Sequence, residues 1–517
     1  MNTSVPVSSQ RHSTRALVAL FLLFALALAV RLPSLNTPPV DVHHVRQADT
    51  ASIARNMLRE GVDVFHPRID WAGPEAGYVE SELPLYGAAV AGLWRALGQT
   101  YLPDHRIPRL LAIFFWLLGG LVLLALVRRR LRGPPWVYLL LYAFSPLAVV
   151  FSRTIQPDSL AVLLMLVAIE RADRSSEGEG PSPWLAALLA GLAAGLAIAV
   201  KGTMALLLPL LPAILLARRR PGTRRRAVLA ALPALVIPVL WYWHAHQTLG
   251  VDGATFGVWG KTAHKWGAPS LWFSLTSWRA IVGSAVAQTL TPLGLLLLVR
   301  GAVVAQRQAE LRMFVVAVLL SCSGFVLLTE GFVLHNYYQL SLVPFASVLC
   351  GAALVDAGGR LGQWGSLPGR LRTAIAVSVT LLVILSVQMG TSFVGQSLLR
   401  DQRVEELSRG VSAVLPRKHS VVVTDRHPQT VMYAIDRRGW HRTALSPREL
   451  RKLQGLGAEY LLLTSSVAEF RDPLMLAYLR LGAIREASGP GWVLYRLRAA
   501  PPLPAKAPLE VQKKSAP

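Results

Sequence analysis

The chain has 517 residues, 53% of them hydrophobic and 16% charged, and its formal net charge is +24. A soluble globular protein usually carries about 25% charged residues, so this composition indicates an integral membrane protein. Positive charges stand in short clusters between apolar runs, such as RRRLR at 128–132, as in the cytoplasmic loops of membrane proteins. We therefore do not expect nucleic acid as a partner.

Eleven apolar segments approach the roughly 17 to 25 residues that cross a bilayer. They lie near residues 16–32, 107–127, 134–151, 159–172, 183–200, 203–217, 227–243, 281–299, 313–329, 338–356 and 373–390. The first also has features of a cleaved signal peptide. We expect a retained helix, because ten further segments follow it.

The positions of Lys and Arg predict the orientation of these spans. Dense arginine clusters fall in alternate loops, which lie inside the cell if the N-terminus is cytoplasmic. An odd number of spans then places the C-terminus outside, which would be the periplasm if the membrane is the inner membrane of a bacterium. Two outside segments are long, 33–106 and 244–280.

The sequence after the first span, DVHHVRQADTASIARNML at 41–58, combines titratable groups with an amphipathic pattern. From Ala48 onward apolar residues recur at helical spacing, and Gly61 suits the end of a helix. We expect a helix at 48–58 that lies on the outer membrane surface. Residues 41–47 would then form a polar rim at the depth of the lipid headgroups.

The C-terminal region has the pattern of a small α/β domain. Short buried strands are predicted at SVVVTD (420–425), EYLLLTSS (459–466) and WVLYRLR (492–498). Between the first two, Ser446 followed by Pro447 and Glu449 predicts the start of a helix.

These patterns divide the chain into three parts. We expect a transmembrane domain at 1–392, an α/β domain outside the membrane at 393–498, and a disordered tail at 499–517.

Polar side chains also lie at the ends of later spans that face outside. Arg153 and Asp158 stand in RTIQPDS, Lys201 in VKGT, and His335, Tyr337 and Tyr338 in HNYYQLSLVP. Glu80, Glu82 and Tyr86 stand in ESELPLY, later in the first outside loop. Lys201 is the only charge in a long apolar region, where an ionisable group usually has a partner. We expect these groups to converge at one depth.

In this order, HHVRQADTASIAR, ESELPLY, RTIQPDS, VKGT and HNYYQLSLVP resemble the motifs of the GT-C glycosyltransferases. The resemblance is to the bacterial glycosyltransferase family 39, the branch similar to protein O-mannosyltransferases and to the aminoarabinose transferase of lipid A. It covers residues 1 to about 390. Each motif is short, and their order together with the long first outside loop makes the resemblance specific.

The resemblance implies a polytopic α-helical enzyme of the GT-C type with about eleven transmembrane helices. Such an enzyme transfers a sugar from a polyprenyl-phosphate donor to a glycan, lipid or protein of the cell envelope. Cations would stabilise the charge that grows on the donor phosphate, and we assign Arg46, Arg153 and Lys201 to this role. A carboxylate would act as general base on the acceptor hydroxyl, with inversion at the sugar.

The identity of the base stays open. In many relatives the first-loop acid is an Asp-Glu pair, whereas here Val42 follows Asp41. Either Asp41 or Asp49 is the candidate base, and Glu82 shares or supports the role. We favour Asp41, because Asp49 has a local ion-pair partner in Arg46. The substrate-binding candidates are His43, His44, Gln47, Glu80, Tyr86, Asp158, His335, Tyr337 and Tyr338.

Other interpretations stand beside these assignments. The tyrosines also suit an aromatic belt, Lys201 a snorkelling residue, and Asp49 a purely structural ion pair. His43 and His44 lack a zinc-site spacing, so we assign no metal site, while a divalent cation stays open as a cofactor. A transporter or lipid flippase is the alternative function, although the sequence shows no paired halves. A third alternative is an inactive member whose C-terminal domain binds envelope partners.

Overall fold

The computed structural model describes residues 7–100, 104–178, 182–218, 220–249, 254–256, 269–360 and 365–498. The predicted tail at 499–517 lies outside the described residues. The chain forms two compact units, each described by itself. Unit 1 comprises Met1–Thr37, Ala54–Pro67 and Val79–Leu399, and unit 2 comprises Pro38–Ile53, Arg68–Tyr78 and Arg400–Pro517. The predicted domain ranges, 1–392 and 393–498, stay predictions.

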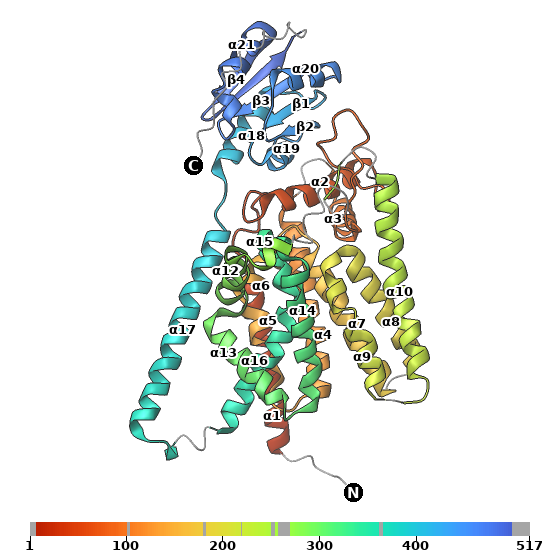
Figure 1. Cartoon of the computed structure of the whole chain (residues 1–517), viewed down its shortest axis with the longest axis vertical. Coiled ribbons are helices and arrows are strands. Elements are labelled where there is room, and N and C mark those ends of the chain that lie inside the picture. The colour runs from red at the N-terminus through yellow and green to blue at the C-terminus, as the bar shows by residue number, and fades with distance from the viewer. Residues whose placement is uncertain are drawn as a thin grey trace. The chain divides into compact units, whose positions relative to one another are not determined.

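Unit 1 is helical (Figure 1). Its helices are α1 (Val7–Ala29), the second part of α2 (His44–Glu60), α3 (Leu85–Ala96), α4 (Arg106–Arg130), α5 (Leu140–Phe144), α6 (Pro146–Phe151), α7 (Asp158–Glu177), α8 (Pro183–Val200), α9 (Leu210–Ala217), α10 (Thr223–His244), α11 (Pro269–Trp272), α12 (Leu275–Ser284), α13 (Thr291–Ala305), α14 (Arg312–Leu327), α15 (Thr329–Leu334), α16 (Val343–Arg360) and α17 (Gly369–Ser397). Short 3-10 or π turns include η1 (Pro135–Leu139), η2 (Gly202–Leu207), η3 (Ala245–Leu249), η6 (Ala285–Leu290), η7 (Ala309–Leu311) and η8 (Asn336–Ser341).

Six helical stretches of the described chain are long and apolar enough to cross a membrane: Arg106–Arg130, Pro183–Val200, Thr223–Leu249, Leu275–Ala305, Ala309–Leu327 and Gly369–Val414. Shorter apolar helices lie at Thr14–Ala29, Pro135–Phe144 and Gly202–Ala217. All eleven predicted apolar segments contain helix, but those at 134–151 and 203–217 are broken into short pieces, where prolines remove backbone N–H donors. The number of eleven crossings stays a prediction.

Helix α8 packs closely against α10 because glycines face the neighbouring backbone. A Cβ atom at Gly191 would overlap the carbonyl oxygen of Ala230, and one at Gly195 would overlap that of Pro233. Small residues of this kind let apolar helices approach each other closely, which increases their van der Waals contact. This packing fixes the end of α8, where Lys201 follows.

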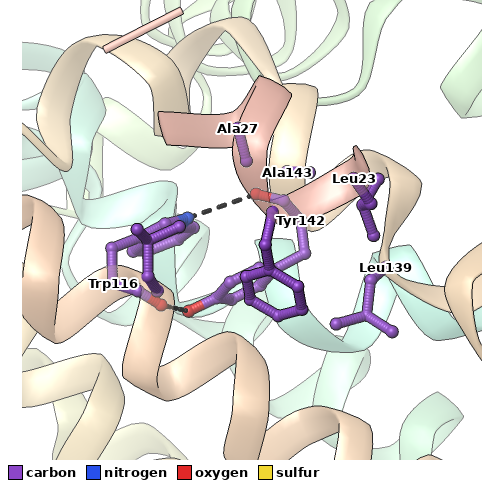
Figure 2. Close-up of a pocket in the computed structure, with 8 residues that line it drawn as sticks. Leu23, Ala27, Trp116, Leu139, Tyr142 and Ala143 are labelled. Carbon is purple, nitrogen blue, oxygen red and sulfur yellow. Dashed lines mark hydrogen bonds between the residues drawn. The ribbon is translucent and has the colours of Figure 1, made fainter. Parts of the chain in front are cut away.

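Helices α1, α4 and α5 meet around two aromatic rings (Figure 2). Trp116 and Tyr142 stack with ring centroids 4.3 Å apart and an interplanar angle of 8°. The indole N–H of Trp116 donates to the carbonyl of Tyr142 at 3.3 Å, and the hydroxyl of Tyr142 donates to the carbonyl of Trp116 at 2.7 Å. The two rings therefore satisfy their own polar groups within an otherwise apolar lining, which includes Leu23, Ala27, Leu139 and Ala143.

Helix α2 begins at His44, one turn before the predicted start at Ala48. The backbone N–H of Gln47 donates to the carbonyl of His43, and no residue between His44 and Ala48 breaks a helix. The predicted end is confirmed, because Gly61 follows Glu60 with φ of +112°.

The polar side of α2 is buried as well as its apolar side. Asp49 is 7% exposed, and Ser52 and Asn56 are each 3% exposed. The predicted position of this helix on the outer membrane surface stays a prediction. Protein side chains replace water there, as the bond between Asp49 and Trp71 shows below.

Unit 2 contains a five-stranded sheet in the order β2-β1-β3-β5-β4. The strands are β1 (Val421–Thr424), β2 (Gly439–Arg442), β3 (Tyr460–Thr464), β4 (Ala483–Gly489) and β5 (Trp492–Leu497). β1 pairs in parallel with β2 and β3, and β5 pairs antiparallel with β3 and β4. Helices α18 (Gln402–Val414) and α19 (Pro428–Ile435) pack on one face, and α20 (Pro447–Gly455) and α21 (Pro473–Gly482) on the other.

The three predicted strands are confirmed as β1, β3 and β5. The predicted start of helix α20 is also confirmed, since the hydroxyl of Ser446 accepts a hydrogen bond from the backbone N–H of Glu449 at 3.2 Å. Strands β2 and β4 were not predicted. Their sequences, GWHR and AIREASG, carry glycine and charged residues and lack the apolar pattern of a buried strand.

Substitution of Gly191 by alanine should destabilise unit 1, because the added methyl group overlaps the backbone of α10. Overpacking of this kind costs about 1–3 kcal/mol. Gly92→Ala is the matched control, since a Cβ at that helical position meets no described atom within 4 Å. The midpoint of thermal unfolding of the purified protein checks this, and equal midpoints for the two variants would contradict the packing.

Candidate active site

Lys201 is the centre of a buried cluster in unit 1. Its ammonium nitrogen lies 3.3 Å from Asp158 Oδ1 and 3.8 Å from Glu82 Oε1. The same nitrogen lies 4.8 Å from the ring centroid of Tyr337 and 5.3 Å from that of Tyr338. Lys201 and Asp158 are each 2% exposed. The isolated charge of the sequence is thus surrounded by carboxylates and aromatic faces.

Helix ends and backbone bonds place these side chains. Lys201 directly follows α8, and Asp158 is the first residue of α7, where a negative charge is favourable. The segment that carries Glu82 is held on both sides. The N–H of Leu83 donates to Ala199 O at 2.8 Å, and the indole N–H of Trp241 donates to Ser81 O at 3.1 Å.

The carboxylates of Asp158 and Glu82 both lie near the ammonium of Lys201, and burial makes that charge costly unless it is paired. The contact with Lys201 thereby helps to hold the Glu82 carboxylate in place. The assignment of Lys201 to a donor phosphate stays a prediction.

His335 and Glu80 are two further candidates in unit 1, and each contacts another side chain of that unit. The ring of His335 lies 5.3 Å from each of the rings of Tyr337 and Tyr338, so these three form one aromatic group beside Lys201. The carboxylate of Glu80 lies 3.2 Å from His246 Nδ1. The backbone N–H of Glu80 donates to Ala254 O at 2.9 Å, which connects the segment before α3 to the segment after η3.

Arg153 and Tyr86 are buried among other partners. Arg153 is 2% exposed, and its carbonyl accepts the guanidinium of Arg109 at 3.3 Å. Tyr86 is 1% exposed, and its hydroxyl donates to Pro108 O at 2.7 Å. The roles predicted for both, in phosphate and substrate binding, stay predictions.

Unit 2 contains the candidates from the start of the first loop. Asp41 is 5% exposed, and its Oδ1 accepts the side-chain amide of Gln47 at 2.6 Å. The same amide nitrogen donates to Val42 O at 2.6 Å. His43 adopts φ of +47°, and His44 Nδ1 shares a hydrogen bond of 2.8 Å with Thr430. Asp41 is therefore oriented by a neutral amide donor.

Asp49 has a different environment. Its Oδ1 accepts the indole N–H of Trp71 at 3.1 Å. Burial raises the pKa of Asp49 to about 6, although the indole bond and the nearby guanidinium of Arg46 oppose the shift. Its carboxylate is consequently a stronger base than an ordinary aspartate and is still mostly ionised at neutral pH.

Three residues near these groups were missed by the sequence analysis. Trp71 contacts Asp49 and His246 contacts Glu80 only through the tertiary fold, so no local pattern signals them. Gln156 is 1% exposed, and its amide has no hydrogen-bond partner among the described residues. Its place in RTIQPDS, between Arg153 and Asp158, was the available signal.

The described residues hold no group of three or more His, Cys, Asp or Glu side chains that suits a metal ion. The open question of a divalent cation is not tested by this geometry. The predicted convergence of the candidates of both units at one depth also stays a prediction.

The fold and the site together define a polytopic membrane protein in which ionisable side chains lie at the ends of apolar helices. A family model, that of dolichyl-phosphate-mannose-protein mannosyltransferases, matches residues 103–243. This stretch contains Arg153, Asp158 and Lys201. No curated protein matches the sequence.

Solved structures share the fold over most of the chain. ArnT from Cupriavidus metallidurans bound to undecaprenyl phosphate has a TM-score of 0.63 and 16% identity, covering 92% of this chain and 97% of that one. The apo form of the same ArnT has a TM-score of 0.62 and 16% identity, covering 94% of this chain and 100% of that one. A third structure is that of the oligosaccharyltransferase AglB from Archaeoglobus fulgidus in complex with an inhibitory peptide and a dolichol-phosphate. It has a TM-score of 0.60 and 12% identity, covering 88% of this chain and 70% of that one. The predicted GT-C fold is confirmed.

The raised pKa of Asp49 predicts a pH-dependent effect of Asp49→Asn. A carboxyl group with a folded pKa near 6 binds its proton more tightly than in the unfolded chain, so its contribution to stability falls as pH rises from about 4 to 6. The loss amounts to roughly 3 kcal/mol. Because asparagine stays neutral, the variant should gain in unfolding midpoint relative to the parent, with the full gain at about pH 7.5 and roughly half of it at about pH 5.

Asp425→Asn is the control of opposite sign. Although burial raises the pKa of Asp425, hydrogen bonds from Arg403, from the backbone of His427 and from Thr464 lower it overall. Its carboxylate thus stabilises the fold above the unfolded pKa, and the variant should lose stability at neutral pH. A larger loss for Asp49→Asn at about pH 7.5 than at about pH 5 would contradict the burial of an ionised carboxylate.

Proposed function

We propose that this protein is a membrane glycosyltransferase that moves a sugar from a polyprenyl-phosphate donor to a hydroxyl group of a cell-envelope acceptor. The observation that carries the proposal is the buried pair of Asp158 and Lys201, with the half-buried Glu82 beside it, at the end of apolar helix α8. Lipid-linked substrates present their reacting atoms at the end of the hydrocarbon. Ionisable side chains at that position are costly to maintain without a function.

The comparisons support this choice of substrate. The matching family model describes mannosyltransferases that use dolichyl-phosphate-mannose, and the similar ArnT and AglB structures hold undecaprenyl phosphate and dolichol-phosphate. The alternative of a transporter or flippase finds no support among these matches. Whether the sugar is a hexose or a pentose, and whether the acceptor is a glycan, lipid or protein, is left to experiment.

The proposed step is a displacement at the anomeric carbon. The acceptor oxygen forms a bond to this carbon while the bond to the phosphate oxygen breaks, and polyprenyl phosphate leaves with the electron pair. A carboxylate takes the proton of the acceptor hydroxyl. Cationic side chains stabilise the phosphate as its charge grows, for which we keep Arg46, Arg153 and Lys201 as candidates. Attack opposite the leaving group inverts the anomeric carbon.

Asp41 and Asp49 are the two candidates for the base, with Glu82 in support. The local pairing of Asp49 with Arg46 favoured Asp41 from the sequence. The environment of Asp49 supplies the opposite argument, because a pKa of about 6 gives a more effective base at neutral pH. Besides its role at the donor phosphate, Lys201 would hold the carboxylate of Glu82, which lies 3.8 Å from its ammonium nitrogen.

The setting that we propose is a bacterial inner membrane, with a cytoplasmic N-terminus and with the α/β domain in the periplasm. The arginine-rich loops support this orientation through the positive-inside rule. A donor flipped to the outer face would then meet an envelope acceptor there.

The test is a transfer assay with the purified protein, a panel of polyprenyl-phosphate sugars and envelope fractions. Replacing the general base should lower kcat by about 10²–10⁴-fold, so either Asp41→Asn or Asp49→Asn should show this loss. Asp63→Asn, in the same loop but at an exposed position, should keep the parent rate. The anomeric configuration of the product reports inversion.

Two outcomes would count against the proposal. Parent rates for both Asp41→Asn and Asp49→Asn would end the catalytic assignment. Absence of transfer by the parent protein with every donor would favour the inactive alternative, in which the C-terminal domain binds envelope partners.

A further inference from the structure

Unit 2 is built from three stretches that lie far apart in the sequence. Two of them, Pro38–Ile53 and Arg68–Tyr78, come from the first outside loop, and the third begins at Arg400. The first stretch contains both candidate bases, Asp41 and Asp49. The C-terminal domain and the acidic segment of the first loop therefore form one folded body, which raises the question of what the domain does to that segment.

Side chains of α18 and α19 hold the beginning of the segment. Val40 is 3% exposed and belongs to the apolar core that α18 and α19 form with the sheet. Its carbonyl accepts the N–H of Asp401 at 2.9 Å. His44 bonds to Thr430 of α19 at 2.8 Å, and its ring meets that of His427 edge to face at 4.7 Å. Residues on both sides of Asp41 are thus attached to the domain.

The second stretch pairs with the edge of the sheet. The N–H of Gly73 donates to Gly439 O at 2.6 Å, and the N–H of Gly439 donates to Asp70 O at 3.0 Å. Ala72 and Trp440 form an antiparallel bridge. Backbone pairing of this kind covers the edge of β2 and fixes the register of residues 70–73 against it.

Trp71 connects this edge to Asp49. Its ring lies 4.4 Å from the ring of His441 in β2, and its indole N–H donates to Asp49 at 3.1 Å. Burial lowers the pKa of His441 to about 4, so this ring packs against Trp71 as a neutral group at physiological pH. A continuous series of contacts runs from the sheet through one indole to one carboxylate.

We propose that the C-terminal domain is a positioning module for the acidic segment of the first loop, with Trp71, Trp440 and His441 as positioning residues. The inference rests on the proposed function, because it takes the segment 41–49 to supply the base. Backbone pairing at β2 aligns Trp71, and Trp71 then sets the orientation and basicity of Asp49. The domain is in this view part of the catalytic apparatus without touching the substrate.

Gly73→Ala is the sharpest way to separate the loop from the domain. Gly73 has φ of +71°, and a Cβ there would overlap the indole of Trp440, which is packed in the core of the domain. Gly98→Ala is a matched control, since Gly98 has the same φ of +71° and a Cβ there meets no described atom within 4 Å. Both variants carry the same backbone strain, and only Gly73→Ala also disturbs the pairing.

Trp71→Phe is a milder second variant, which keeps an aromatic ring and removes the indole N–H. The bond from Trp71 lowers the pKa of Asp49, so its loss should raise that pKa further. The acidic limb of the profile of kcat against pH should then move to higher pH if Asp49 is the base. Loss of packing alone does not move such a limb.

Hydrogen exchange of the backbone amides of residues 41–53, together with the transfer rate, tests the proposal in the full-length protein. Gly73→Ala should speed exchange in this segment and lower kcat, each by about tenfold or more, and Gly98→Ala should do neither. Trp71→Phe should leave exchange near the parent level and shift the pH profile.

The failures can be distinguished. Unchanged exchange at 41–53 in Gly73→Ala overturns the positioning role even if transfer is active. Faster exchange with an unchanged transfer rate overturns the claim that the positioned segment serves catalysis. Absence of transfer by the parent itself is a failure of the proposed function, and the exchange result then still reports whether the domain holds the loop.

Discussion

A buried ammonium group requires partners, and the arrangement of unit 1 around α8 supplies them. Lys201 lies at the end of an apolar helix, where water does not solvate it, so carboxylates and aromatic faces must replace the solvent. This requirement brings together the start of α7, the segment before α3 and the turn η8, which are far apart in the sequence. Close packing of α8 on α10 through glycine fixes the position from which the lysine reaches them.

Much of the fold was predictable because local patterns determine it. Apolar segments became helices, three alternating or apolar stretches became strands β1, β3 and β5, and Ser446 capped a helix through its own hydroxyl. The start of α2 was placed one turn too late, because the polar residues that precede Ala48 read equally well as a loop. Strand β2 was missed, since its pairing with β1 and with the first loop stabilises it more than its own residues do.

The candidate site was predictable only in part. The motifs identified Lys201, Asp158 and the two tyrosines as chemically important, and the structure brings these four together. The sequence contains no local pattern to indicate that Trp71, 22 positions after Asp49, bonds to it. Nor did it distinguish the environments of the two aspartates, because burial is a property of the folded chain. An amide donor orients Asp41, whereas burial raises the pKa of Asp49 against the opposing effect of its indole bond.

The pairing of residues 70–73 with β2 determines which sheet edges of the C-terminal domain are exposed. Without the first loop, residues 400–498 would expose the backbone N–H and C=O groups of β2 along an open sheet edge, in addition to the edge at β4. Exposed edges recruit strands from other molecules. Residues 400–498 expressed by themselves would therefore carry an open edge that residues 70–73 cover in the full chain. The domain and the two stretches of the first loop form one compact unit, so a substitution on either side of this pairing affects the other side.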